Sequence, residues 1–128
     1  IYTPLYTLSL HDALPIYGDG SCAYSLAEID TFVRKGRGVI AVIGNDARWN
    51  QIARDQVTLL GSDVGVTLRR SDYHRVAEGY GGVGLELADD ESIPRVLAEA
   101  KALARQGLPV VINALLEVSD FRQGSISV

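Results

Sequence analysis

Two short polar turns carry the residues whose types and spacing suggest chemistry. The first reads Gly18-Asp19-Gly20-Ser21 and stands just before a predicted helix, where a strand is expected to end. Glycines in such a turn let the backbone approach a phosphate closely, and the helix N-terminus adds N–H donors and a favourable dipole. An aspartate there can bind Mg2+, which takes oxygen ligands from carboxylates and phosphates. Taken alone, this sequence is more often a plain tight turn with Asp in a helix cap.

The second turn, Gly44-Asn45-Asp46, follows the next predicted strand and places its polar residues 26 and 27 positions after Asp19. A strand–turn–helix–strand unit of that length returns the chain beside its starting point. We therefore expect the side chains of Asp19 and of Asn45 or Asp46 to cluster at the carboxyl edge of one sheet. Two adjacent strand ends of this kind can hold one Mg2+ and a diphosphate together.

The elements that must position these turns alternate between helix and strand. Apolar residues recur at helical spacing or follow a cap signal in four segments, which predict helices at 23–35, 48–60, 72–78 and from Ser92 to about residue 105. Ser71 and Ser92 are the expected N-caps of the last two helices. Apolar runs predict strands at 39–43, 64–68, 83–87 and 110–116. Gly36 and Gly107 are expected to end the helices before them. The pattern predicts an α/β fold with a parallel sheet flanked by helices, in which ligands bind outside the carboxyl ends of the strands.

Composition excludes several classes of protein. The chain has 128 residues, 47% apolar and 22% charged, with a net charge of −4, which is typical of one globular domain. The negative charge argues against nucleic-acid binding. No apolar run is long enough for a membrane span, and we expect a cytoplasmic protein. The single Cys22 excludes an internal disulfide framework. Trp49, after the second turn, either walls a site there or simply packs.

The first residues differ from the rest. Residues 7–16 read TLSLHDALPI, which resembles the conceptual translation of a common sequencing-library adaptor. We therefore interpret residues 1–16 as a non-native N-terminal scar and residues 17–128 as the domain. A native N-terminal strand and turn is the alternative. On the scar interpretation these residues pack poorly, although Leu14 and Ile16 can imitate the end of a strand before Gly18.

At the two turns the chain resembles a known family. The GDGS turn, a helix containing Leu26-Ala27-Glu28, an apolar strand and then Asn45-Asp46 are similar to the thiamine-diphosphate-binding motif of the acetolactate synthase superfamily. Residues 17–128, including 44–56 and 120–125, look like the C-terminal part of acetolactate synthase-like proteins, a group that contains 2-hydroxyacyl-CoA lyases. The resemblance implies the thiamine-diphosphate-binding fold, here truncated at its N-terminal side.

The resemblance also implies roles for residues. Thiamine diphosphate and Mg2+ are the implied cofactors, and the residue matching Asp19 binds the metal. The family has two Asn residues at the second turn, which align with Asn45 and Asp46, so either side chain can be the next ligand. The main-chain carbonyl of Arg48 would be the third. The implied cofactor-binding residues are Gly18, Asp19, Gly20, Ser21, Asn45, Asp46 and Arg48.

The implied activity belongs to a longer protein. Relatives of this kind cleave or form carbon–carbon bonds next to a carbonyl, with an essential Glu supplied by a separate pyrimidine-binding domain, usually of the neighbouring subunit. We therefore expect no catalytic residue in this chain, no activity from the chain alone, and a homo-oligomer for the full-length protein. The alternative function is a non-catalytic flavodoxin-like module that binds a phosphate or a partner protein, which need not require Mg2+. The sequence does not specify the substrate.

Overall fold

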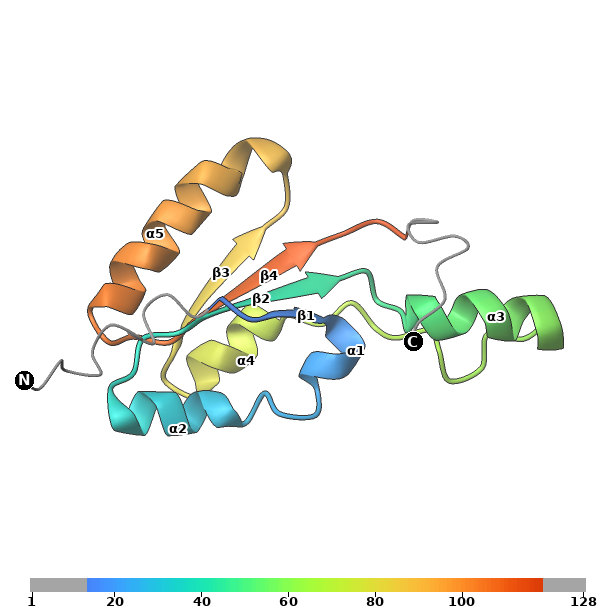
Figure 1. Ribbon diagram of the computed structural model, residues 1–128, viewed down its shortest axis with the longest axis horizontal. Coiled ribbons are helices and arrows are strands. Elements are labelled where there is room, and N and C mark those ends of the chain that lie inside the picture. Colours follow the sequence, from blue (N-terminus) through green and yellow to red (C-terminus); the bar gives the residue numbers. More distant parts are fainter. Residues whose placement is uncertain (1–13, 119–128) are drawn as a thin grey trace, which may run out of the picture.

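All four strands of the sheet run parallel. The computed structural model describes residues 14–118, so residues 1–13 of the adaptor-like segment and residues 120–125 lie outside it. The strands are β1 (Ile16–Gly18), β2 (Ile40–Asn45), β3 (Val83–Leu87) and β4 (Val110–Leu115), in the spatial order β1-β2-β4-β3 (Figure 1). Helices cover both faces, which confirms the predicted α/β architecture.

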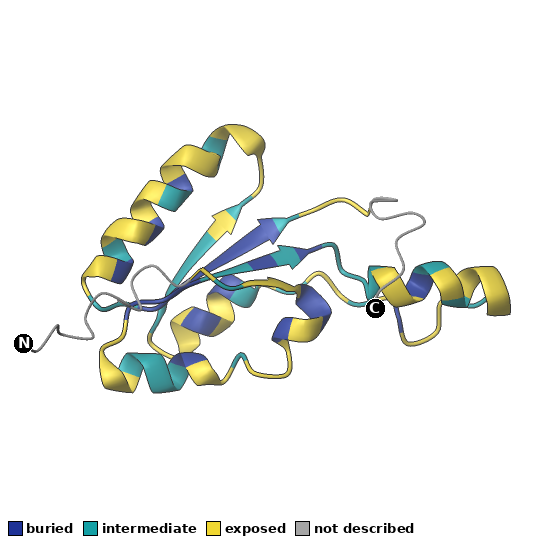
Figure 2. Ribbon diagram, in the orientation of Figure 1, coloured by how far each residue is buried: buried dark blue, intermediate teal, exposed yellow. Residues whose placement is uncertain are grey.

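The helices divide between the two faces of the sheet and its carboxyl edge. Helix α5 (Ile93–Arg105) covers one face, preceded by a short 3-10 turn, η3 (Asp90–Ser92). Helices α1 (Asp19–Cys22), α2 (Glu28–Lys35) and α4 (Tyr73–Gly79) lie on the other face. Helix α3 (Asn50–Leu60) extends beyond the carboxyl ends of the strands and is mostly exposed (Figures 1 and 2). No helix within residues 14–118 is long and apolar enough to cross a membrane.

The core has two parts because successive strand residues point to opposite faces. One cluster joins α5 to the sheet and consists of Ile40, Val96, Ala100, Ala104, Val110 and Ile112. The other lies under α1, α2 and α4 and consists of Cys22, Ile29, Ile43, Ala77 and Val111. The apolar stripe predicted for α5 is confirmed at Val96, Ala100 and Ala104, all of which are buried.

Glycines end the helices where predicted. Gly36 adopts a left-handed conformation with φ 57° at the end of α2, and Gly107 has φ 83° just after α5. Strand β3 has the predicted bounds. The 23–35 helix prediction is right only from Glu28 onward. Before it, the Tyr24 N–H donates to the Ser21 carbonyl and the Glu28 N–H to the Ser25 carbonyl, so tight turns replace the regular helix.

Three further expectations need correction. Residues 64–68 form no strand; their one β-bridge pairs Thr67 with Arg48, and backbone hydrogen bonds also join Val66 to Trp49 and Leu68 to Ala47. Ser71 does not cap α4, because the helix begins at Tyr73 with Asp72 in the N-cap position and no side-chain cap bond. Ser92 does not cap α5 with its side chain either. The Asp89 carboxylate instead accepts the Ser92 N–H at 2.8 Å and caps the preceding turn.

Strand β2 runs further than its apolar residues indicate. The predicted break at Gly44 is absent, because Gly44 pairs with Gly18 on one side and with Ala114 on the other. Pairing with β4 then carries the strand one residue further, to Asn45. On the β1 side, Ile16 pairs with Val42, while Leu14 and Ile16 remain exposed.

Candidate functional site

The sheet register brings the two polar turns together. Gly18 and Gly44 are partners in the parallel pairing of β1 with β2, so the residues after them leave the sheet side by side. They open onto a cleft of about 560 Å³ at the carboxyl edge. Asp19 and Asp46 both line this cleft, together with Gly18, Gly20, Ser21 and Arg48. The structure therefore places six of the seven predicted site residues around one space.

Asp19 is the most constrained of these residues. It is 1% exposed, and its Oδ1 accepts the Gly20 N–H at 2.9 Å. Its Oδ2 is buried and has no hydrogen-bond partner within the described part of the chain. Burial raises the pKa of this carboxyl, and the nearby Asp46 raises it further, against the lowering effect of the backbone N–H groups of Gly20 and Ala47. A buried carboxylate oxygen without a partner is costly unless a cation or donor meets it.

The turn that carries Asp46 is strained and firmly held. Ala47 has φ 58°, which for a residue with a Cβ costs roughly 1–2 kcal/mol. Within the turn, the Arg48 N–H donates to Asp46 Oδ1 at 3.2 Å. From outside, Leu68 N–H donates to the Ala47 carbonyl at 2.8 Å. Residues 64–68, which were expected to form a strand, thus hold this turn in place through a backbone hydrogen bond.

Asn45, the seventh predicted residue, does not line the cleft, although its Oδ1 is buried without a hydrogen-bond partner among residues 14–118. It is fully buried, and its Nδ2 donates to the Ser71 carbonyl at 2.9 Å and to Asn113 Oδ1 at 3.1 Å. Asn113 in turn lies 3.2 Å from His74 Nδ1. Of the two candidate ligands, Asp46 thus lines the cleft, whereas the Asn45 side chain belongs to a buried hydrogen-bond network. The sequence signal that was missed is a single Asn inside the apolar run of β4.

Aromatic residues form one wall beside Asp19. A Cβ built on Gly20 would come within 2.6 Å of the Trp49 indole, so only glycine leaves room for this ring. Tyr24 meets Trp49 edge to face at 6.2 Å between ring centroids. The Tyr73 hydroxyl donates to the Asp19 carbonyl at 3.3 Å. Trp49 therefore both packs and lines the cleft.

The remaining wall is the start of α3. Its first three residues, Asn50, Gln51 and Ile52, line the cleft. A helix N-terminus favours anions through its N–H groups and its dipole. Arg48 adds a cation, and its Nε is buried with no hydrogen-bond partner among residues 14–118. The cleft thus combines two carboxylates suited to a hard cation with groups suited to an anion.

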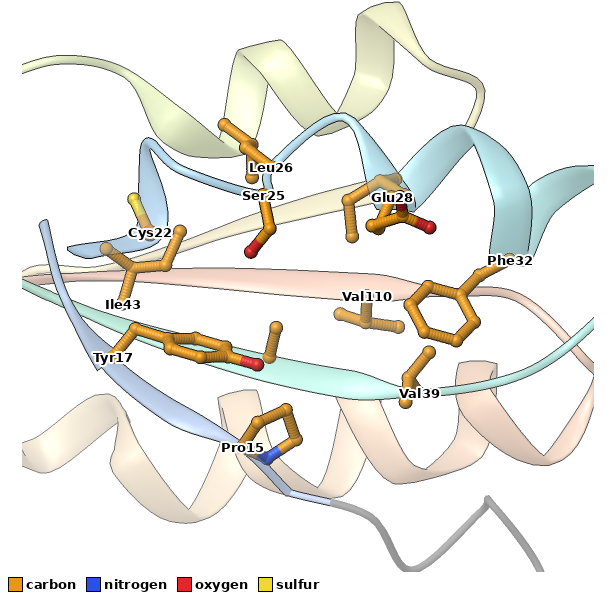
Figure 3. A pocket seen from close by; sticks show the side chains of 12 residues that line it. Pro15, Tyr17, Cys22, Ser25, Leu26, Glu28, Phe32, Val39, Ile43 and Val110 are labelled. Carbon is orange, nitrogen blue, oxygen red and sulfur yellow. The ribbon is translucent and has the colours of Figure 1, made fainter.

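A second cavity of about 210 Å³ lies between the β1–β2 ribbon and helices α1 and α2 (Figure 3). Its lining is mainly apolar and includes Tyr17, Phe32 and Val39. Cys22 reaches it too, and burial, with a smaller contribution from the Asp19 charge, raises the pKa of this thiol to about 11. The thiol therefore stays protonated, and this cavity offers neither a nucleophile nor the paired charges of the cleft.

Within residues 14–118, no three His, Cys, Asp or Glu side chains gather to hold a metal ion.

Comparisons with known proteins identify the family of the chain. The family described as "Thiamine pyrophosphate enzyme, C-terminal TPP binding domain" matches residues 10–114. Thiamine pyrophosphate (TPP) is another name for thiamine diphosphate. The 2-hydroxyacyl-CoA lyase 2 of Mus musculus is 50% identical over 115 residues, which cover 88% of this chain and 18% of that protein. A probable acetolactate synthase of Mycobacterium bovis is 36% identical over 124 residues, covering 91% and 22%.

Solved structures give the same fold. The benzoylformate decarboxylase of Polynucleobacter necessarius superposes with a TM-score of 0.74 at 20% identity, over 83% of this chain and 20% of that one. The chain thus spans about a fifth of the length of the relatives it matches.

Proposed function

Since this chain belongs to the thiamine pyrophosphate enzymes and carries their C-terminal TPP-binding domain, we propose that it binds the diphosphate of thiamine diphosphate through Mg2+ in the cleft between Asp19 and Asp46. The observation that carries the proposal is the buried, unpartnered Oδ2 of Asp19 beside a second carboxylate in an open cleft. Such an oxygen fits a hard divalent cation, whose preferred ligands are oxygens.

The residues around the cleft divide the binding between them. Asp19, Asp46 and the main-chain carbonyl of Arg48 would hold Mg2+. Gly18, Gly20 and Ser21 would border the diphosphate, together with the first turn of α3. Asn45 would act indirectly, by fixing the end of β2 from which the Asp46 turn departs. This assigns the metal to Asp46 rather than to Asn45.

Bound thiamine diphosphate supplies an electron sink for breaking or forming a carbon–carbon bond next to a carbonyl. This chain's residues bind and orient that group at its diphosphate end. The longer protein would act as a lyase or synthase, by similarity to the 2-hydroxyacyl-CoA lyase 2 and acetolactate synthase relatives. The pyrimidine-binding domain, usually of a neighbouring subunit in a homo-oligomer, would supply the catalytic Glu, so this chain alone is inactive.

Intrinsic fluorescence offers a direct test, because Trp49 is the single tryptophan and lines the cleft. Thiamine diphosphate is titrated into the chain with Mg2+ and with a chelator. The proposal expects saturable quenching only with Mg2+, and its loss in Asp19→Asn. Binding that persists with the chelator would instead support the flavodoxin-like phosphate module. Turnover of 2-oxo acids or 2-hydroxyacyl-CoA thioesters by the chain alone would contradict the proposal that it only binds the cofactor and needs a second domain for catalysis.

A further inference from the structure

We propose that the Arg48 side chain binds the diphosphate in the cleft and offsets the extra negative charge that Asp46 brings to the metal site. This inference rests on the proposed function and adds a cationic ligand to it. It is separate from the role proposed for the Arg48 main-chain carbonyl.

The charges of the cleft call for such a group. Asp19 and Asp46 together carry two negative charges, which cancel those of one Mg2+. The motif this chain resembles has Asn where Asp46 stands, so its metal site keeps one positive charge to attract the diphosphate. Here that positive charge is lost at the second turn. The Arg48 guanidinium, always protonated in proteins, restores it two residues later.

Arg48 is placed and available for this role. Of the Arg and Lys residues between positions 14 and 118, it is the one that lines the cleft. Its Nε is buried without a hydrogen-bond partner, and none of the ion pairs found in residues 14–118 involves it. A guanidinium pairs well with phosphate because its N–H groups match two phosphate oxygens at once.

The neighbouring Arg69 and Arg70 do not line the cleft. Arg70 donates from Nη2 to the Leu116 carbonyl at 2.7 Å. Arg69 lines an adjoining cavity of about 390 Å³, which shares Asp19 and Trp49 with the cleft, but Arg69 does not line the cleft itself. The backbone of Arg48, by contrast, is fixed by its N–H bond to Asp46 and by the bridge to Thr67. The Arg48 side chain therefore extends from a fixed backbone, at a cleft that Asp19 and Asp46 also line.

The test measures the binding of magnesium pyrophosphate and of magnesium thiamine diphosphate, both by Trp49 fluorescence and by calorimetry. Arg48→Gln keeps the main-chain carbonyl but removes the charge. The control is Arg37→Gln, which removes an exposed arginine near the opposite end of β2. We expect Arg48→Gln to weaken both ligands about tenfold, the size of one charge-assisted hydrogen bond, and Arg37→Gln to leave both unchanged. Arg48→Lys should fall between wild type and Arg48→Gln, because it keeps the charge and loses the planar fork.

A second variant ties the effect to Asp46. If Arg48 offsets the charge of Asp46, then the double variant Asp46→Asn/Arg48→Gln should bind magnesium pyrophosphate more tightly than Arg48→Gln alone. Circular dichroism and thermal unfolding check that each variant is folded. Unchanged affinity in a folded Arg48→Gln, with wild type still binding in a Mg2+-dependent way, overturns this inference and leaves the proposed function standing. Failure of wild type to bind either ligand overturns both.

Discussion

The layer between α5 and the sheet differs sharply from the cleft at the carboxyl edge. In the α5 layer, small residues bring helix and sheet close, and a Cβ on Gly38 would lie 1.8 Å from the Ala104 carbonyl oxygen. At the cleft, Asp19 Oδ2 and Arg48 Nε lack hydrogen-bond partners within the described residues, and Ala47 holds a left-handed backbone. The first region stabilises the fold. The second carries local costs that a bound metal and anion would relieve.

The largest expected effect is on ligand affinity at the cleft. Asp19→Asn replaces the buried carboxylate with a neutral amide, and we expect Mg2+-dependent affinity for thiamine diphosphate to fall by at least about 100-fold, or roughly 2.7 kcal/mol. Calorimetric titration measures the change. Asp55→Asn, which alters an exposed carboxylate on α3, is the matched control and should bind like wild type. Equal affinity for Asp19→Asn and wild type would remove Asp19 from the site.

The next effect belongs to the α5 layer. Val96 is 2% exposed, so Val96→Ala leaves a cavity against the sheet and should lower the free energy of unfolding by about 2 kcal/mol. Val64→Ala removes the same atoms from a side chain that is 80% exposed and should change it by less than about 0.5 kcal/mol. Urea denaturation separates the two. Similar losses for both would mean that the packing of this layer does not determine stability.

A smaller effect on the free energy of unfolding is expected at the cleft when no metal is bound, and here the substitution should stabilise the chain rather than destabilise it. Because the pKa of Asp19 is raised in the folded chain, the folded state holds that proton more tightly than the unfolded state does. Stability in chelator should therefore fall as pH rises from the ordinary value of 3.8 through the folded pKa. Asp19→Asn lacks this loss and should be more stable than wild type at pH 7, with no difference at pH 3. A less stable Asp19→Asn at pH 7 would contradict the account.

The smallest expected effect concerns backbone strain. Ala47→Gly relieves the positive φ at the second turn and should stabilise the chain by about 0.5–1 kcal/mol. Ala102→Gly, at an exposed position inside α5, should destabilise it by about 1 kcal/mol. Thermal unfolding of the pair provides the measurement. An Ala→Gly change is thus expected to stabilise the chain at the second turn and to destabilise it in α5. Changes of the same sign at both positions would refute the claim that the second turn is strained.

The sequence predicted the alternation of helices and strands and the meeting of the two turns, because these follow from apolar periodicity and from parallel connections. It left open the choice between Asn45 and Asp46. Which of the two lines the cleft depends on where β2 ends: Gly44 pairs with both β1 and β4, and Asn45 pairs with Leu115 of β4, so the strand continues past its apolar residues. The role of residues 64–68 was also not predictable from the sequence, because their apolar pattern fits a strand equally well. Their role becomes visible only in the folded chain, where the backbones of Val66 and Leu68 form hydrogen bonds with residues at the second turn.

The most direct test of the metal site is paramagnetic broadening by Mn2+, which can replace Mg2+ at oxygen ligands. Mn2+ is added at substoichiometric amounts to isotopically labelled chain with thiamine diphosphate, and backbone amide signals are followed by NMR. The account predicts that signals of residues 18–21 and 46–49 broaden first, while those of α5 stay sharp. Broadening confined to the exposed acidic residues Asp89, Asp90 and Glu91, with the two turns unaffected, would contradict the assignment of the metal to Asp19 and Asp46.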